Sequence, residues 1–193
     1  MNFAHGDNVE ALRTKLKAFM AEHVYPSEPI LDAHVRSDKR WEPVPIIEEL
    51  KAKAREAGLW NLFMPAYHGG LTNEQYAPRA EIMGRVMWSP EAFNCNAPDT
   101  GNMEVFMNYA TKAQQEQWLK PLLNGDIRSS YAMTEPQVAS SDATNIALRI
   151  TKEGNEWVLN GHKWFITGAM YERTKIFIVM GKSDPDHPNR HKQ

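Results

Sequence analysis

Residues 133–145, which read MTEPQVASSDATN, gather hydroxyl and carboxyl side chains in one short segment. Among them are Thr134, Ser140, Ser141 and Asp142. Hydroxyl groups and backbone N–H groups where a strand passes into a loop can bind the oxygens of a phosphate or carbonyl group. The same side chains can instead bond to their own backbone in a surface turn. Composition alone favours the surface turn, and both interpretations stay open at this point.

A second segment, GHKWFIT at residues 161–167, combines an aromatic pair with a hydroxyl group. In most proteins Trp164 and Phe165 would belong to the core side of a strand. A flavin ring, however, needs an aromatic wall and a hydrogen-bond donor near its N5 atom, and an aromatic ring beside a hydroxyl group supplies both. The segment therefore predicts either a core strand or one wall of a flavin site.

The histidines show no catalytic or metal-binding pattern. His68 precedes Gly69 and Gly70, but no G-x-S-x-G nucleophile elbow accompanies them, so we interpret it as a histidine in a turn. The other histidines lack the spacing of metal ligands. His187 and His191 fall in a polar tail, where we expect solvated side chains.

Segments with a helical period occupy the first two thirds of the chain. Their apolar residues recur at spacings of three and four, so that each set shares one helical face. The inward-facing residues that this period predicts are Val9, Leu12, Leu16, Phe19 and Met20; Ile46, Ile47, Leu50, Ala54 and Ala57; Tyr76, Ala80, Met83 and Met87; Met103, Phe106, Met107 and Ala110; and Trp118, Leu119, Leu122 and Leu123. We therefore expect an all-α domain over residues 1–127.

Local signals predict where these helices begin and end. Pro26 and Pro29 cannot continue a helix, so the first one is expected to end near Tyr25. Thr72 and Thr111 each precede a glutamine by three residues, which is the pattern of a capping box at the start of a helix.

In the last third of the chain, apolar residues alternate with polar ones, which is typical of strands. The alternation runs through Ile146, Leu148 and Ile150 and resumes at Trp157 and Leu159. The turn sequence KEGN lies between the two runs, so we expect a hairpin there.

Two further strands are predicted. The dipeptide Asn160-Gly161 signals a tight turn into a strand with the sequence HKWFIT, and KIFIVMG at residues 175–181 is apolar on both faces. About four strands are too few to close a barrel, and an open sheet leaves a bare edge. The predicted fold class is thus α+β, an N-terminal all-α domain followed by an incomplete β-barrel-like domain at residues 128–193.

The composition excludes several classes of protein. Of the 193 residues, 42% are hydrophobic and 24% are charged, as in soluble globular proteins. A net charge of -2 with mixed signs argues against a nucleic-acid partner, and no run approaches the roughly 18 apolar residues of a membrane helix. The single cysteine, Cys95, and a start without the features of a secretory signal indicate a reducing compartment.

Taken with their surroundings, the two polar segments resemble the acyl-CoA dehydrogenases. That family has a loop of the form A/C-x-T-E-P-x-x-G-S-D and, further along, a segment N-G-x-K-x-W-I-T; this chain has AMTEPQVASSD and NGHKWFIT. The lead-in WLKPLLNGDIRSSYAMTEP is similar to the family's last helix and first strand, and LFMPAYHGGLT to its P-x-x-x-G-G-L loop. The resemblance covers the whole chain. The variant PQVASSDATN most resembles the branch fused behind a phosphotransferase-like domain.

The resemblance implies FAD as cofactor. Residues that it places at the cofactor are Tyr131, Met133, Thr134, Ser140, Ser141, Phe165, Ile166 and Thr167. The N–H group of Met133 and the hydroxyl of Thr134 would bond the pyrimidine edge of the flavin. Phe165 stands where the family commonly has a tryptophan against the ring, and Thr167 where a hydroxyl and an N–H group reach N5. Ser141 would face the pyrophosphate and the acyl-CoA chain.

The chain departs from the family pattern in two places that affect the expected pyrophosphate contacts. One extra residue lies between Glu135 and Asp142, and Ser140 replaces the usual glycine, which permits a positive φ or a close approach to phosphate. Glu135 could serve as the base that the reaction requires. The family, however, places its base in a third, C-terminal α domain, so we interpret Glu135 as a structural acid of the loop.

The activity that the resemblance implies is FAD-dependent dehydrogenation of acyl-CoA thioesters to trans-2-enoyl-CoA, of the fatty acid β-oxidation type. Electrons would pass to an electron-transfer flavoprotein or to oxygen. A homodimer or homotetramer is expected at full length, in the cytoplasm, or in mitochondria or peroxisomes of a eukaryote.

The C-terminal α domain of the family is absent from these residues, so we assign no catalytic residue and expect the chain alone to be inactive. The alternative is a non-catalytic truncated paralog or a helical interaction module.

Overall fold

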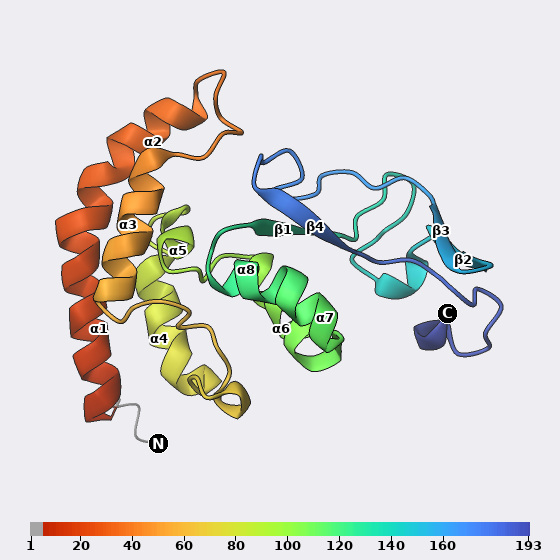
Figure 1. Ribbon diagram of the computed structural model, residues 1–193, viewed down its shortest axis with the longest axis horizontal. Coiled ribbons are helices and arrows are strands. Elements are labelled where there is room, and N and C mark those ends of the chain that lie inside the picture. Colours follow the sequence, from red (N-terminus) through yellow and green to blue (C-terminus); the bar gives the residue numbers. More distant parts are fainter. Residues whose placement is uncertain (1–5) are drawn as a thin grey trace.

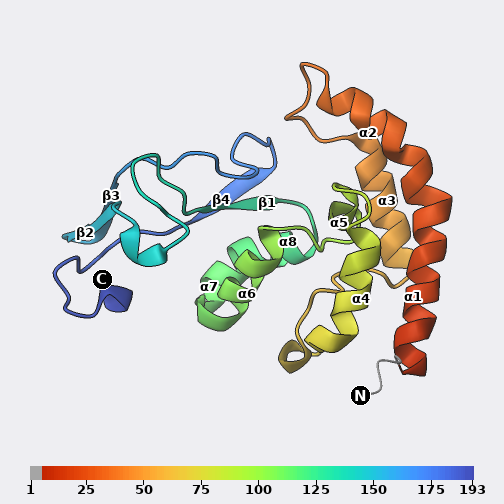
Figure 2. The same ribbon diagram turned by 180° about the vertical axis from the view of Figure 1, so that it is seen from behind.

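The computed structural model describes residues 6–193; residues 1–5, part of the start that is predicted not to be a secretory signal, lie outside the described residues. Helices fill one end of the molecule and strands the other (Figures 1 and 2). The α-helices are α1 (Asp7–Phe19), α2 (Glu28–Val35), α3 (Pro45–Glu56), α4 (Asn73–Met83), α5 (Ser89–Ala92), α6 (Asp99–Tyr109), α7 (Lys112–Gln114) and α8 (Lys120–Leu123). None of the helices within residues 6–193 is both long enough and apolar enough to cross a membrane.

Shorter helical turns complete the helical region and occur in the loops of the β region. Two are π-helical, η1 (Met20–Val24) and η4 (Gln115–Leu119). The others are 3₁₀ turns, η2 (Tyr25–Ser27), η3 (Ala66–His68), η5 (Ala143–Asn145) and η6 (Arg190–Lys192).

The first helix does not end at Tyr25, so that prediction is wrong. From α1 the chain continues without a break through η1 and η2 into α2, which leans away from the axis of α1 (Figure 1). Pro26 and Pro29 each lie in the first turn of a helical segment, η2 and α2. Neither proline has an N–H group to donate to the preceding turn, so the helix changes type near these positions while the chain stays helical.

The core of the helical region confirms the predicted period. Leu16, Met20, Leu50, Phe93 and Met103 are all 2% exposed or less and belong to one apolar cluster. Both predicted capping boxes form, at the start of α4 and of α7.

One predicted core residue is wrong. The side chain of Met87 is 97% exposed. Helix α4 ends at Met83 with Gly84 as its C-cap, so the helical period no longer applies at Met87.

The β region contains two separate two-stranded sheets. Strand β1 (Arg128–Ala132) pairs in parallel with β4 (Thr174–Val179), and β2 (Arg149–Glu153) pairs antiparallel with β3 (Glu156–Asn160), as the predicted hairpin requires. No closed barrel forms within residues 6–193, and the α+β prediction is confirmed. The predicted strand at HKWFIT is wrong, because residues 162–167 join no sheet and the chain bends at Phe165, whose φ is 49°.

A cluster of charged side chains joins the two regions. Arg128, at the start of β1, lies between the carboxylates of Glu91 and Asp99. An oxygen of Asp99 also accepts the N–H group of Ser129 at 2.7 Å. Burial by itself would lower the pKa of Arg128, but the two carboxylates raise the pKa above its usual value. The guanidinium therefore stays charged and fixes the position of β1 against α6.

Candidate functional site

The end of β1 and the segment at residues 163–168 lie side by side. The N–H group of Trp164 donates to the carbonyl of Thr134 at 3.1 Å. The hydroxyl of Ser130 donates to the carbonyl of Thr167 at 2.9 Å. The two segments that the sequence singled out are thereby brought to one edge of the β region.

Several backbone N–H groups at this edge are free. Within residues 6–193, the N–H groups of Met133, Thr134 and residues 165–167 donate to no acceptor of the chain, and neither do the hydroxyls of Thr134 and Thr167. Backbone N–H groups in folded proteins are almost always paired with protein, water or ligand. A flat ligand whose rim carries hydrogen-bond acceptors, as the isoalloxazine ring of FAD does, fits this set of donors.

The aromatic pair beside these donors is exposed, so of the two interpretations that the sequence left open the core strand does not hold. Phe165 is 82% exposed and Trp164 is 43% exposed, with their ring centroids 4.7 Å apart. Phe165 has a φ of 49°, in the left-handed region that is costly for a bulky residue. Such conformations persist only where the surrounding structure enforces them, and they gather at ligand sites.

Glu135 is a structural acid, as the sequence predicted. Its oxygens accept the N–H groups of Ala147 at 2.7 Å and Leu148 at 2.9 Å, and the ammonium of Lys163 at 2.8 Å. Burial acts to raise the pKa of Glu135, but these bonds outweigh it and hold the pKa below the usual value. A carboxylate held in this way is a poor proton acceptor, so its geometry does not suit the base of a reaction.

The hydroxyl-rich loop divides into inward and outward side chains. Ser140 is buried, and its hydroxyl accepts the N–H group of Glu135 at 2.7 Å. One oxygen of Asp142 accepts the N–H group and the hydroxyl of Thr144, which lowers the pKa of Asp142. Ser141 is exposed, and its hydroxyl has no partner among the described residues. The surface-turn interpretation therefore holds for Asp142, while Ser141 is free to bind a ligand.

The serine in place of the family glycine causes no strain in the loop. Ser140 is not among the residues with a positive φ in the described chain. Its place in the loop depends on its hydroxyl bond to Glu135 and needs no left-handed backbone.

An apolar hollow of about 440 Å³ adjoins Tyr131, between β1 and α6. Its lining consists of Ala97, Pro98, Thr100, Gly101, Asn102, Val105 and Tyr131. Sequence reasoning missed the residues from α6. Gly101 was the signal in the sequence that could have pointed to them, because a glycine inside a helix lowers its stability and often leaves room for a neighbouring group. A Cβ atom added at Gly101 would meet nothing within 4 Å.

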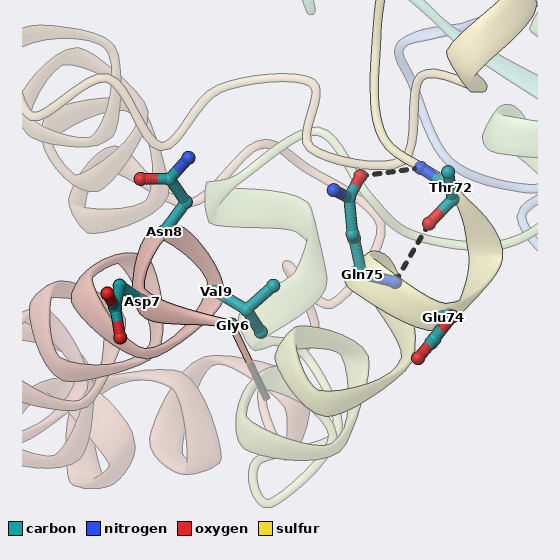
Figure 3. A pocket seen from close by; sticks show the side chains of 7 residues that line it. All are labelled: Gly6, Asp7, Asn8, Val9, Thr72, Glu74 and Gln75. Carbon is teal, nitrogen blue, oxygen red and sulfur yellow. Dashed lines mark hydrogen bonds between the residues drawn. The ribbon is translucent and has the colours of Figure 1, made fainter. Parts of the chain in front are cut away.

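A larger hollow of about 590 Å³ lies far from these segments, where the starts of α1 and α4 meet (Figure 3). Asp7 and Glu74 flank it, and Thr72 and Gln75 bond each other there in the capping box. None of the predicted site residues lines it. The side chains that line it belong to the starts of α1 and α4, so the candidate site is the edge between β1 and residues 163–168.

His68, His187 and His191 lie outside the two segments of the candidate site. His68 lies in the turn η3, with a ring nitrogen 3.2 Å from the side-chain oxygen of Asn108. His191 is exposed and His187 half-buried in the C-terminal tail. Within residues 6–193, no three His, Cys, Asp or Glu side chains are placed to hold a metal ion.

Comparison with known families agrees with the fold and the two motifs. The N-terminal domain model of the acyl-CoA dehydrogenases matches residues 6–126, and the middle domain model matches residues 130–193. The chain belongs to the acyl-CoA dehydrogenase family.

Relatives and solved structures give the same result. Acyl-CoA dehydrogenase family member 10 of Mus musculus is 50% identical over 192 residues, which cover 96% of this chain and 18% of the mouse protein. A structure from Mycobacterium abscessus, assigned to the acyl-CoA dehydrogenases, superposes with a TM-score of 0.89 at 46% identity; the match covers 96% of this chain and 48% of that one. The chain thus spans less than half the length of either relative.

A more distant structure, an acyl-CoA dehydrogenase of Bacillus anthracis complexed with FAD, has a TM-score of 0.61 and 23% identity. The match covers 95% of this chain and 30% of that one. At this identity the likeness shows the fold alone.

Proposed function

We propose that this chain forms one wall of the flavin and substrate site of an FAD-dependent acyl-CoA dehydrogenase, which oxidises acyl-CoA thioesters to trans-2-enoyl-CoA. The observation that carries the proposal is the set of free N–H and hydroxyl donors of Met133, Thr134 and Thr167 on one edge. The exposed ring of Phe165 beside them adds an aromatic wall. The FAD in the B. anthracis structure of the same fold supports the choice of cofactor.

Each residue has a distinct role in this proposal. The N–H group of Met133 and the hydroxyl of Thr134 bind the pyrimidine edge, with Tyr131 and Ile166 beside the ring. Phe165 covers one face, and Thr167 donates near N5. Hydrogen-bond donors placed where negative charge develops in the transition state lower the reaction barrier more than donors that only bind the ground state.

The remaining contacts of the proposal involve the loop and the apolar hollow. Ser141 binds the pyrophosphate or the acyl-CoA chain, and Ser140 supports it by closing the loop. The hollow beside Tyr131 and Val105 takes the apolar acyl chain, because burial of methylene groups there is favourable.

The flavin supplies the acceptor for the hydride from the substrate. No residue of this chain is proposed as the base, because Glu135 is already bonded through both of its oxygens. An electron-transfer flavoprotein or oxygen as acceptor, a homo-oligomer at full length, and a cytoplasmic or organellar location also belong to the proposal.

The test is an anaerobic titration of the intact, FAD-loaded protein with saturated acyl-CoA substrates, followed at the flavin absorbance band. Bleaching of the band with release of trans-2-enoyl-CoA is expected. The alternative, a non-catalytic paralog or interaction module, has the chain's exposed apolar side chains in its favour. A protein that purifies without flavin and does not take up added FAD would support that alternative.

A further inference from the structure

We propose that Lys163 and Glu135 form a positioning pair that sets the spacing between the two FAD-facing segments, residues 133–134 and 164–167. The inference rests on the proposed function, because it concerns how that site is held in shape. Neither side chain is proposed to contact the reacting atoms.

The two FAD-facing segments have little else to hold them together. Strand β1 pairs with β4, and residues 161–166 join no strand. The backbone bond between the two segments runs from the N–H group of Trp164 to the carbonyl of Thr134. In addition, the hydroxyl of Ser130 in β1 donates to the carbonyl of Thr167. A segment held by so few bonds can move by local opening.

The side chain of Lys163 connects the two FAD-facing segments. Its ammonium donates to the carbonyl of Met133 and to the carboxylate of Glu135, each at 2.8 Å, and its side chain is 10% exposed. Because its own backbone leads directly into Trp164, one side chain couples the position of Met133 to that of the aromatic segment. The bond also occupies the carbonyl of Met133 and leaves its N–H group free.

Glu135 anchors the ammonium and extends the connection to a third segment. Besides the ammonium it binds the N–H groups of Ala147 and Leu148, which lead into the hairpin β2–β3. The N–H group of Glu135 is in turn held by Ser140. The carboxylate thus joins the start of the loop, its end and the aromatic segment at one point.

The burial of the pair makes each partner depend on the other. The side chain of Glu135 is 4% exposed. Removal of one partner of a buried ion pair leaves an unpaired charge in a poorly solvated place, whereas removal of both does not. The double variant should therefore disturb the segments less than the sum of the single variants.

The experiment compares the single variants Lys163→Met, Glu135→Gln and Lys163→Arg and the double variant Glu135→Gln/Lys163→Met with the wild type, in the intact protein. The effect of the double variant should be smaller than the sum of the effects of Lys163→Met and Glu135→Gln. Amide hydrogen exchange is measured without FAD, and the FAD dissociation constant and flavin absorbance spectrum are measured with it. In Lys163→Met we expect exchange at the amides of Ala147, Leu148 and Trp164 to be about tenfold faster. The FAD dissociation constant should rise about tenfold with a shifted flavin band, and Lys163→Arg should restore both.

Two controls separate positioning from general damage. Lys192→Met removes an exposed lysine of the same region that has no ion-pair partner among the described residues, and it should change none of these quantities. Exchange in α6 should stay at wild-type rates in every variant, because its core does not include the pair.

Unchanged exchange at Trp164 in Lys163→Met would overturn the inference. So would faster exchange with an unaltered FAD dissociation constant and spectrum, because the pair would then hold the loop without serving the cofactor. A wild-type protein that binds no FAD would instead refute the proposed function and the pair's role toward FAD; exchange at Trp164 would then decide only whether the pair joins the segments.

Discussion

The helical and β regions of this chain are held together in different ways. In the helical region, side chains from α1, α3 and α6 pack into one apolar cluster, where Leu16, Leu50 and Met103 are 2% exposed or less. In the β region the hairpin β2–β3 is exposed along almost its whole length, and Trp157 is 58% exposed. Charged and polar bonds around Glu135 and Arg128 give the β region its order.

This contrast shows that the helical region completes its own core and the β region does not. A helix satisfies its backbone bonds internally and needs only one apolar face covered. A two-stranded sheet leaves bare edges and needs further layers over its faces. The free donors and the exposed ring of Phe165 lie in this second, less covered region, and a ligand or further protein has access to them there.

The largest expected effect comes from matched leucine substitutions in the two regions. Leu50→Ala should lower the free energy of unfolding by about 3 to 4 kcal/mol, because it leaves a cavity in a packed core. Leu159→Ala in the exposed hairpin should change it by less than about 1 kcal/mol. Urea unfolding followed by circular dichroism measures both values. Equal losses would mean that the hairpin is covered in solution, and the contrast between the regions would fail.

The next effect is a selective loss of order in the β region at acid pH. The folded pKa of Glu135 lies below the usual value of about 4.5, so its contribution to stability is present above that pH. It is lost as the pH falls through the folded pKa. Amide exchange at Ala147 and Leu148, corrected for intrinsic rates, should therefore accelerate below pH 4.5 while exchange in α6 does not. In Glu135→Gln the acceleration should be absent, and its persistence would contradict the assignment to Glu135.

Thr167→Val tests whether the free donors of the β region serve the flavin. Loss of a hydroxyl near N5 should raise the barrier to flavin reduction by acyl-CoA by about 1 to 3 kcal/mol. Stopped-flow reduction of the intact, FAD-loaded protein gives the rate, and the flavin spectrum reports the ring environment. An unaltered rate and spectrum would place Thr167 away from the ring.

The smallest effects should separate the two neighbouring serines. Ser140→Ala leaves the buried N–H group of Glu135 without its acceptor and should cost about 1 to 2 kcal/mol of stability. Ser141→Ala should change stability by less than about 0.5 kcal/mol, because its side chain is exposed. Ser141→Ala should nevertheless raise the dissociation constant of FAD or acyl-CoA more than Ser140→Ala does. Thermal unfolding and ligand titration measure the two effects; the reverse order in binding would move the cofactor contact to Ser140.

The sequence alone predicted the parts of the molecule that depend on neighbours along the chain. The helical period located the core at Leu16, Leu50 and Met103, and the capping boxes at Thr72 and Thr111 formed as expected. The hairpin followed from its turn sequence. These features arise from contacts over a few residues, so local spacing contains the necessary information.

Only the tertiary structure decided the features that depend on distant parts of the chain. The parallel pairing of β1 with β4 joins strands far apart in the sequence, which no local pattern specifies. HKWFIT lies outside this sheet and Phe165 is exposed, although the composition of HKWFIT is typical of a core strand. The contact of Lys163 with Glu135 depends equally on the fold. Residue types and local periods are set by the sequence, but a strand's partner and a side chain's exposure depend on which distant segments pack against it.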